Sequence, residues 1–199
     1  MQGWSLPIYQ VPYLTLFEHF KSSWITRIEI NTGKLRKYRT FKNEYKTEDY
    51  LSIPLSKKYR SSFTKFRSGV APIRVETGRY ENLKLEERIC PICKTGVEDE
   101  FHVLFTCSAY DNFRNCLFNH VKCFVPEFDL LSEVEKFTVL FSHIECYKLC
   151  AKTCFLILQS RRWLLYNWCV YEYVIPLNSC CLFNIYSIYG VQFPSMFTF

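Results

Sequence analysis

Four residues in one short stretch of the sequence could bind a single metal ion. Cys90, Cys93, His102 and Cys107 follow the pattern C-x2-C-x8-H-x4-C. A CxxC pair brings two thiolates to one ion from a tight turn, and a later His and Cys can complete a tetrahedron with ligand distances of roughly 2.0 to 2.3 Å. Because three sulfurs and one imidazole favour Zn²⁺ over Mg²⁺ or Ca²⁺, we expect a zinc site at these residues.

The role expected of this zinc knuckle (residues 90–107) is structural. Protein side chains would fill all four positions around the ion, so none is left for a reactive water. Metal binding would instead help the segment to fold, because so short a loop buries little apolar surface. The alternative is a group of buried free cysteines beside an unrelated histidine, since some close spacings arise by chance among 11 Cys.

Two other cysteine groups fit metal binding less well. A second site is the less favoured interpretation of a C-x3-H-x2-C group, which offers only three ligands spread around a helix: Cys116, His120 and Cys123. The other group recurs every four residues, which is typical of a buried helix stripe: Cys146, Cys150 and Cys154.

The residues between the ligands predict how the knuckle is positioned. Thr95-Gly96 favours a turn after the CxxC pair, where a glycine can aim backbone amides at the sulfurs. The acidic run 98–100 favours the start of a short helix carrying His102, because carboxylates stabilise a helix N-terminus. Three apolar side chains are expected to dock that helix on the core: Phe101, Leu104 and Phe105.

The spacing of apolar residues predicts a mainly α-helical fold around the knuckle. Part of 34–51 is expected to be helical, because apolar residues recur there at spacings of three and four. A second helix is predicted between Ser56 as N-cap and Gly69 as C-terminal stop. Its buried face is expected to hold Tyr59, Phe63 and Phe66. Residues 70–80 are expected to be extended.

Three helices are predicted after the knuckle. The first covers 110–125, with Phe113 and Leu117 inward. Ser132 and Glu135 form a capping box before the second, and the third covers about 146–166. We therefore divide the chain into an irregular N-terminal flank (1–33), a basic helical segment (34–89), the knuckle (90–107), a second helical segment (108–166) and an irregular apolar tail (167–199).

The tail raises the question of a membrane span. A transmembrane helix needs about 20 mainly apolar residues. The segment 163–189 is long enough, but Asn167, Glu172, Pro176, Asn178 and Asn184 interrupt it. A tail-anchored membrane protein is therefore the less favoured alternative to a loose or partly buried tail.

The formal net charge is +6, and Lys and Arg are concentrated in the first half of the chain. Such a basic face attracts phosphates without reading sequence. We expect weak, salt-sensitive binding of RNA or DNA, with the aromatic residues in the core and these basic residues in contact with phosphate: Lys57, Lys58, Arg60, Lys65, Arg67, Arg74 and Arg79. An ordinary solvated helix face is the alternative, and Arg74 and Arg79 could instead pair with Glu76 and Glu81.

Motifs for catalysis are not found in the sequence. It has no glycine-rich phosphate loop, no G-x-S-x-G, no H-E-x-x-H and no pair of aspartates that could hold two Mg²⁺ ions. We therefore expect no enzyme activity. The odd number of cysteines and the lack of a secretory signal at the start favour an intracellular location, nuclear or cytoplasmic, with reduced thiols.

The order of several motifs resembles the zinc-binding region at the C-terminal end of non-LTR (LINE-type) retrotransposon reverse transcriptases. The resemblance covers roughly residues 34–166 and rests on KLRKYRTFK, EDYL, FTKFRSGVAPIRVETGRY, ERICPIC, VEDEFHVLFTCSAYDNFR and Arg161-Arg162. It implies that Cys90, Cys93, His102 and Cys107 bind zinc and that the knuckle helps to hold RNA or DNA. The polymerase domain is missing, so a non-catalytic remnant is implied. A zinc-stabilised protein-interaction module is the alternative.

Overall fold

The computed structural model describes residues 13–29, 35, 37–40, 42 and 44–172. These residues form helices joined by short turns, and no strand occurs among them; a single antiparallel bridge joins Ile89 and Val97. The α-helices are α1 (Tyr13–Glu29), α2 (Lys57–Ser68), α3 (Arg74–Thr77), α4 (Asp111–Lys122), α5 (Glu133–Ser142) and α6 (Tyr147–Glu172). The expected mainly α-helical fold is confirmed.

Short helical turns connect these helices. One is a π-helical turn, His102–Thr106. The others are 3-10 turns: Tyr38–Thr40, Asp49–Ser52, Leu85–Glu87, Ser108–Tyr110, Pro126–Leu130 and Ile144–Cys146.

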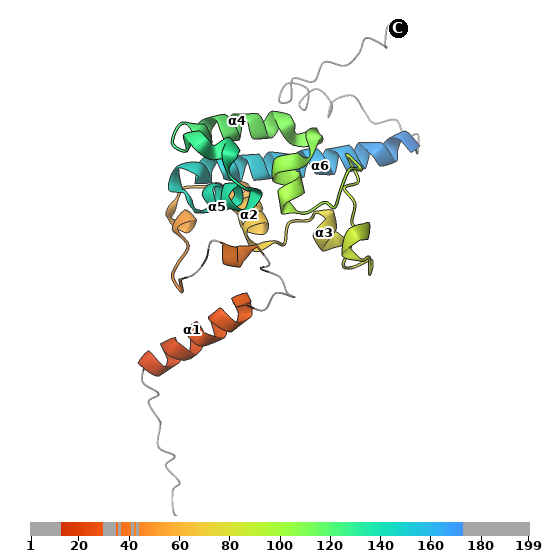
Figure 1. Ribbon diagram of the computed structural model, residues 1–199. Coiled ribbons are helices and arrows are strands. Elements are labelled where there is room, and N and C mark those ends of the chain that lie inside the picture. Colours follow the sequence, from red (N-terminus) through yellow and green to blue (C-terminus); the bar gives the residue numbers. More distant parts are fainter. Residues whose placement is uncertain (1–12, 30–34, 36, 41, 43, 173–199) are drawn as a thin grey trace, which may run out of the picture.

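Helix α6 is the element against which the others pack. It contacts α2, α4 and α5 and runs along the whole body of the fold (Figure 1). Of the predicted cysteine stripe, Cys150 and Cys154 lie on its inner face and Cys146 lies in the 3-10 turn just before it; all three are fully buried. Since these small apolar side chains let neighbouring helices approach closely, their role in the core is confirmed.

Helix α2 begins and ends where the sequence predicts. Ser56 occupies the N-cap position in extended backbone, although its hydroxyl makes no capping bond. Gly69 stops the helix with φ 70°, a left-handed conformation that glycine adopts without a steric penalty. Phe63 and Phe66 are fully buried, and Tyr59 is half-buried against the ring of Phe155 on α6.

Helices α4 and α5 also follow their sequence signals. Leu117 and Val121 of α4 are fully buried. At the start of α5, Ser132 Oγ accepts a hydrogen bond from the backbone N–H of Glu135, and the Glu135 carboxylate accepts one from the backbone N–H of Ser132. This reciprocal pair is the predicted capping box.

Three segments differ from the sequence predictions. The flank 1–33 contains a regular helix, α1, which lies to one side of the body in Figure 1. Residues 70–80 are not extended throughout, because α3 forms within them. The described part of 34–51 has two 3-10 turns where an apolar stripe predicts a longer helix. Leu35 has φ 76°, which a helix does not tolerate, and its N–H donates to the Ser68 carbonyl at the end of α2.

Most of the predicted apolar tail (167–199) lies outside the residues that the structure describes. Helix α6 continues to Glu172, beyond the end predicted near residue 166, and the rest of the predicted apolar tail, 173–199, lies outside the described residues. Among the helices that are described, none combines the length and apolar character needed to cross a bilayer.

Phe63→Ala tests the core between α2 and α6. The Phe63 ring lies 4.9 Å from the ring of Phe141 and 5.5 Å from that of Tyr147, so truncation leaves a cavity that three elements line. We expect the free energy of unfolding to fall by about 3–5 kcal/mol in urea denaturation. Tyr80→Ala, at a side chain that is 75% exposed, is the control and should change it little. A change below about 1 kcal/mol for Phe63→Ala would contradict this packing.

Candidate metal centre

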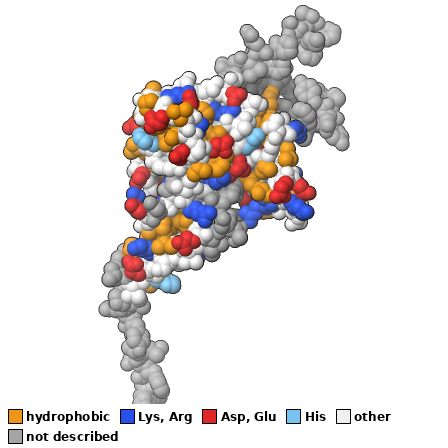
Figure 2. Space-filling model, in the orientation of Figure 1, with side chains coloured by type: hydrophobic (Ala, Val, Ile, Leu, Met, Phe, Trp, Pro, Cys, Tyr) orange, Lys and Arg blue, Asp and Glu red, His pale blue; other side chains and the backbone are white. Residues whose placement is uncertain are grey.

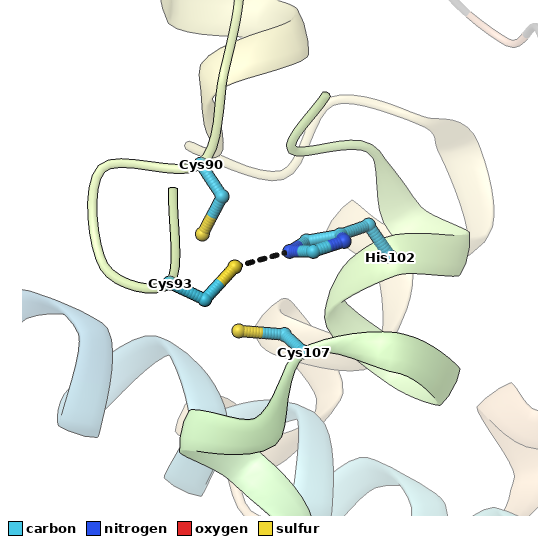
Figure 3. A group of neighbouring side chains, drawn as sticks. All are labelled: Cys90, Cys93, His102 and Cys107. Carbon is cyan, nitrogen blue, oxygen red and sulfur yellow. Dashed lines mark hydrogen bonds between the residues drawn. The ribbon is translucent and has the colours of Figure 1, made fainter. Parts of the chain in front are cut away.

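The four predicted ligand side chains lie together at one point beside α6. One ligand atom from each of Cys90, Cys93, His102 and Cys107 lies within 4.8 Å of the other three, and the side chains point toward one another in Figure 3. Cys90, His102 and Cys107 are buried, while Cys93 is half-buried. The residues are therefore close enough to bind one metal ion.

The spacing of the atoms fits a tetrahedral ion. Ligands about 2.0 to 2.3 Å from one centre are about 3.3 to 3.8 Å apart in a tetrahedron. The Sγ of Cys93 and the Nε2 of His102 lie 3.2 Å apart, close to that range, and already make a hydrogen bond (Figure 3). All four ligand atoms lie within 4.8 Å of one another, a separation compatible with one shared cation.

Backbone hydrogen bonds shape the loop that carries the CxxC pair. The N–H of Cys90 donates to the Gly96 carbonyl, and the N–H of Lys94 donates to the Cys90 carbonyl. Lys94 has φ 61°, so the left-handed residue of the turn is Lys94. Gly96 was expected to supply the backbone freedom that this turn needs. A Cβ added at Gly96 would contact only His102 Nδ1, at 4.0 Å, so close packing does not require a glycine there. Thr95 contributes through its hydroxyl, which lies 3.1 Å from Cys93 Sγ.

A wide helical turn brings the other two ligands to the same side. Asp99 Oδ1 accepts a hydrogen bond from the N–H of His102, so part of the expected role of the acidic run is confirmed. The N–H of Cys107 then donates to the carbonyl of His102, five residues earlier. This π-helical turn, a geometry often found at functional sites, aims both side chains at the CxxC loop (Figure 3).

The three thiols differ in acidity. Burial raises the pKa of Cys90, and it raises the pKa of Cys107 to about 12. Burial acts in the same direction on Cys93, but hydrogen bonds from Thr95 and from the other two thiols stabilise its thiolate and lower its pKa to about 6. Cys93 is therefore the most acidic of the three thiols. A divalent ion bound here would displace the protons of the other two thiols, so metal affinity should rise with pH.

A buried ion pair connects the knuckle to α6. Glu98 is fully buried, and its two carboxylate oxygens accept hydrogen bonds of 2.7 Å from Nε and a terminal nitrogen of Arg161. One of these oxygens also accepts from the N–H of Arg74, and the other lies 3.9 Å from the Sγ of Cys90. Glu98 was expected to stabilise a helix N-terminus; instead, it positions Cys90 relative to α6 and α3.

The basic residues of α2 fall into two groups, one exposed and one with a structural role. Lys57, Lys58 and Lys65 are exposed. Arg60 is half-buried and donates to the Ile53 carbonyl. Arg67, expected to contact phosphate, is only 5% exposed.

The prediction that Arg67 contacts phosphate is wrong, because its side chain is buried and paired within the protein. Its guanidinium pairs with Glu48 and donates to the Phe141 carbonyl. Lys42 Nζ lies 3.1 Å from the same Glu48 carboxylate, and Tyr38 donates to it as well. Arg67 therefore joins residues 38–48 to the core and is not exposed to a ligand.

The two arginines of the α3 region make ion pairs. Arg74 lies 2.5 Å from Glu81, and Arg79 lies 3.3 Å from Glu76. These two glutamates are the partners named as the alternative to phosphate contact. On the face shown in Figure 2, Lys and Arg side chains are likewise interspersed with Asp and Glu. A continuous basic strip is not present on that face.

The second cysteine group does not gather into a site. Cys116, His120 and Cys123 are all exposed, and within the described part of the chain only the knuckle brings three or more metal-ligating side chains together in this way.

Comparisons with models of known protein families, with curated proteins and with solved structures give no match.

Cys93→Ser tests the ligand set. Loss of one of four ligands should weaken Zn²⁺ binding by more than the 10- to 100-fold that loss of an outer partner typically costs, and it should remove hydrogen-exchange protection at the amides of Lys94 and Cys107. Cys116→Ser, at an exposed cysteine, is the control. The test combines competition with a chromogenic chelator and hydrogen exchange. Parental affinity and protection in Cys93→Ser would exclude this metal centre.

Arg161→Met tests the buried ion pair. It leaves the Glu98 carboxylate buried without its cation, so the free energy of unfolding should fall by about 3–5 kcal/mol. Arg162→Met, the same change at an exposed neighbour, should alter it by less than about 0.5 kcal/mol. Combining Arg161→Met with Glu98→Gln should restore part of the loss, because the unpaired charge is removed. Additive losses in the double variant would show that the two residues are not coupled.

Proposed function

We propose that this chain is a non-catalytic, zinc-stabilised module that binds RNA or DNA. The observation that carries the proposal is the convergence of three sulfurs and one imidazole nitrogen beside α6, in a chain whose helix α2 carries exposed lysines. The knuckle supplies folding free energy, and α2 supplies the contacts to phosphate.

Zinc is the ion that the donor set suits best. A Cys3His set is typical of structural zinc sites, and burial of three of the four residues leaves little access for a substrate. Bound zinc would supply charge and fixed geometry without a reactive water. Because the thiols must stay reduced to bind it, the proposal includes an intracellular location, nuclear or cytoplasmic.

Nucleic-acid binding rests on the exposed lysines of α2, with Lys57, Lys58 and Lys65 as the contacts retained from the sequence prediction. Contacts of this kind position phosphate without reading bases. The resemblance to the zinc-binding region of non-LTR reverse transcriptases supports the same assignment and suggests an origin as a remnant without the polymerase.

The salt dependence of binding tests this function. For a single strand, the slope of log K against log salt is about −0.7 for each phosphate neutralised. Lys58→Ala combined with Lys65→Ala should therefore make the slope less steep by about 1.4 units in filter binding with RNA and DNA oligonucleotides. Lys152→Ala, at an exposed residue of α6, controls for loss of surface charge.

The absence of binding at low salt would reject the proposed function. In that case a zinc-stabilised protein-interaction module becomes the better interpretation, because the metal centre does not depend on the lysines.

A further inference from the structure

A groove of about 680 Å³ runs between α2 and α6. Its lining combines basic side chains from both helices with apolar and aromatic ones, and includes Lys58, Lys65, Phe155, Gln159, Arg162 and Tyr166. No Asp or Glu is among the residues that line it. This composition differs from the mixed charges seen on the face in Figure 2.

The cations of the groove are available to a ligand. Lys58, Lys65 and Arg162 are exposed, and among the described residues none of them makes an ion pair with an acidic side chain. Arg161, beside Arg162, differs because Glu98 already neutralises it. An anion entering the groove therefore meets three positive charges without having to displace a carboxylate.

Helical spacing places these groups in two rows. Lys58 and Lys65 are seven residues apart, so they share one face of α2 and lie about 10.5 Å apart along its axis. On α6, Phe155, Arg162 and Tyr166 recur at intervals of seven and four and share the face toward the groove. A strand lying in the groove would contact lysines on one side and an arginine on the other.

The aromatic side chains have different roles. Phe155 is half-buried, with the Tyr59 ring at 5.2 Å and Lys58 Nζ at 5.0 Å from its centre, so it belongs to the floor. Tyr166 is 62% exposed at the end of the groove. An exposed ring beside a cation can stack on a nucleobase, but only where the base is unpaired.

We infer that the groove between α2 and α6 binds single-stranded RNA or DNA, with phosphates at Lys58, Lys65 and Arg162 and a base stacked on Tyr166. The inference rests on the proposed function and adds the position and the strandedness of the ligand. Arg162 and Tyr166 were not among the contacts predicted from the charge distribution of the sequence.

Fluorescence anisotropy of the zinc-loaded full chain tests the inference, with a labelled uridine oligonucleotide and a duplex of the same length as probes. The single strand should bind more tightly. Tyr166→Ala should weaken its binding by about fivefold or more, and Tyr166→Phe should restore most of the affinity because the ring is kept. Arg162→Ala should make the salt slope less steep by about 0.7, whereas Lys152→Ala, an exposed charge outside the groove, should weaken binding less than Arg162→Ala does.

Several outcomes would overturn the inference while leaving the proposed function in place. They are equal affinity for the duplex, parental affinity in Tyr166→Ala, and equal effects of Lys152→Ala and Arg162→Ala. Displacement of the oligonucleotide by polyglutamate at equal charge would also overturn it, because the groove would then favour any acidic polymer. Failure of the parent chain to bind either probe at low salt would instead reject the proposed function.

Discussion

The arrangement of residues 89–107 depends on holding three thiols and an imidazole within a few ångströms of one another. Burial raises the pKa of Cys90 and Cys107, so without a cation these two thiols keep their protons. One divalent ion would replace those protons and join the CxxC loop to the turn His102–Thr106. A single set of bonds would thus fix a segment that contains no α-helix of standard length.

The buried Glu98–Arg161 pair extends this constraint to the rest of the molecule. Glu98 lies between two ligands in sequence and contacts α3 and α6 at once. Arg161 is adjacent to Arg162, which faces the groove beside α2. Glu98 therefore contributes to the position of α6 relative to the metal centre.

The sequence predicted the four residues that come together at the candidate metal centre, because they are close in sequence and their spacing is typical of a metal site. It also identified α2, α4 and α6, whose apolar periods and caps are local signals. Helix α1 was missed, although Phe17, Phe20, Trp24 and Ile28 recur at spacings of three and four. The partners of Glu98 and Arg67 could not be predicted, because the first pairs across 63 residues and the second is buried by segments distant in sequence.

Native mass spectrometry of the purified full chain tests the central claim most directly, since it reports both the bound metal and the folded state. The account predicts one Zn²⁺ per chain, with low charge states typical of a compact protein, and a shift to high charge states when a chelator removes the ion. Protein that carries no metal after preparation under reducing conditions, yet stays compact and unfolds cooperatively, would contradict the claim.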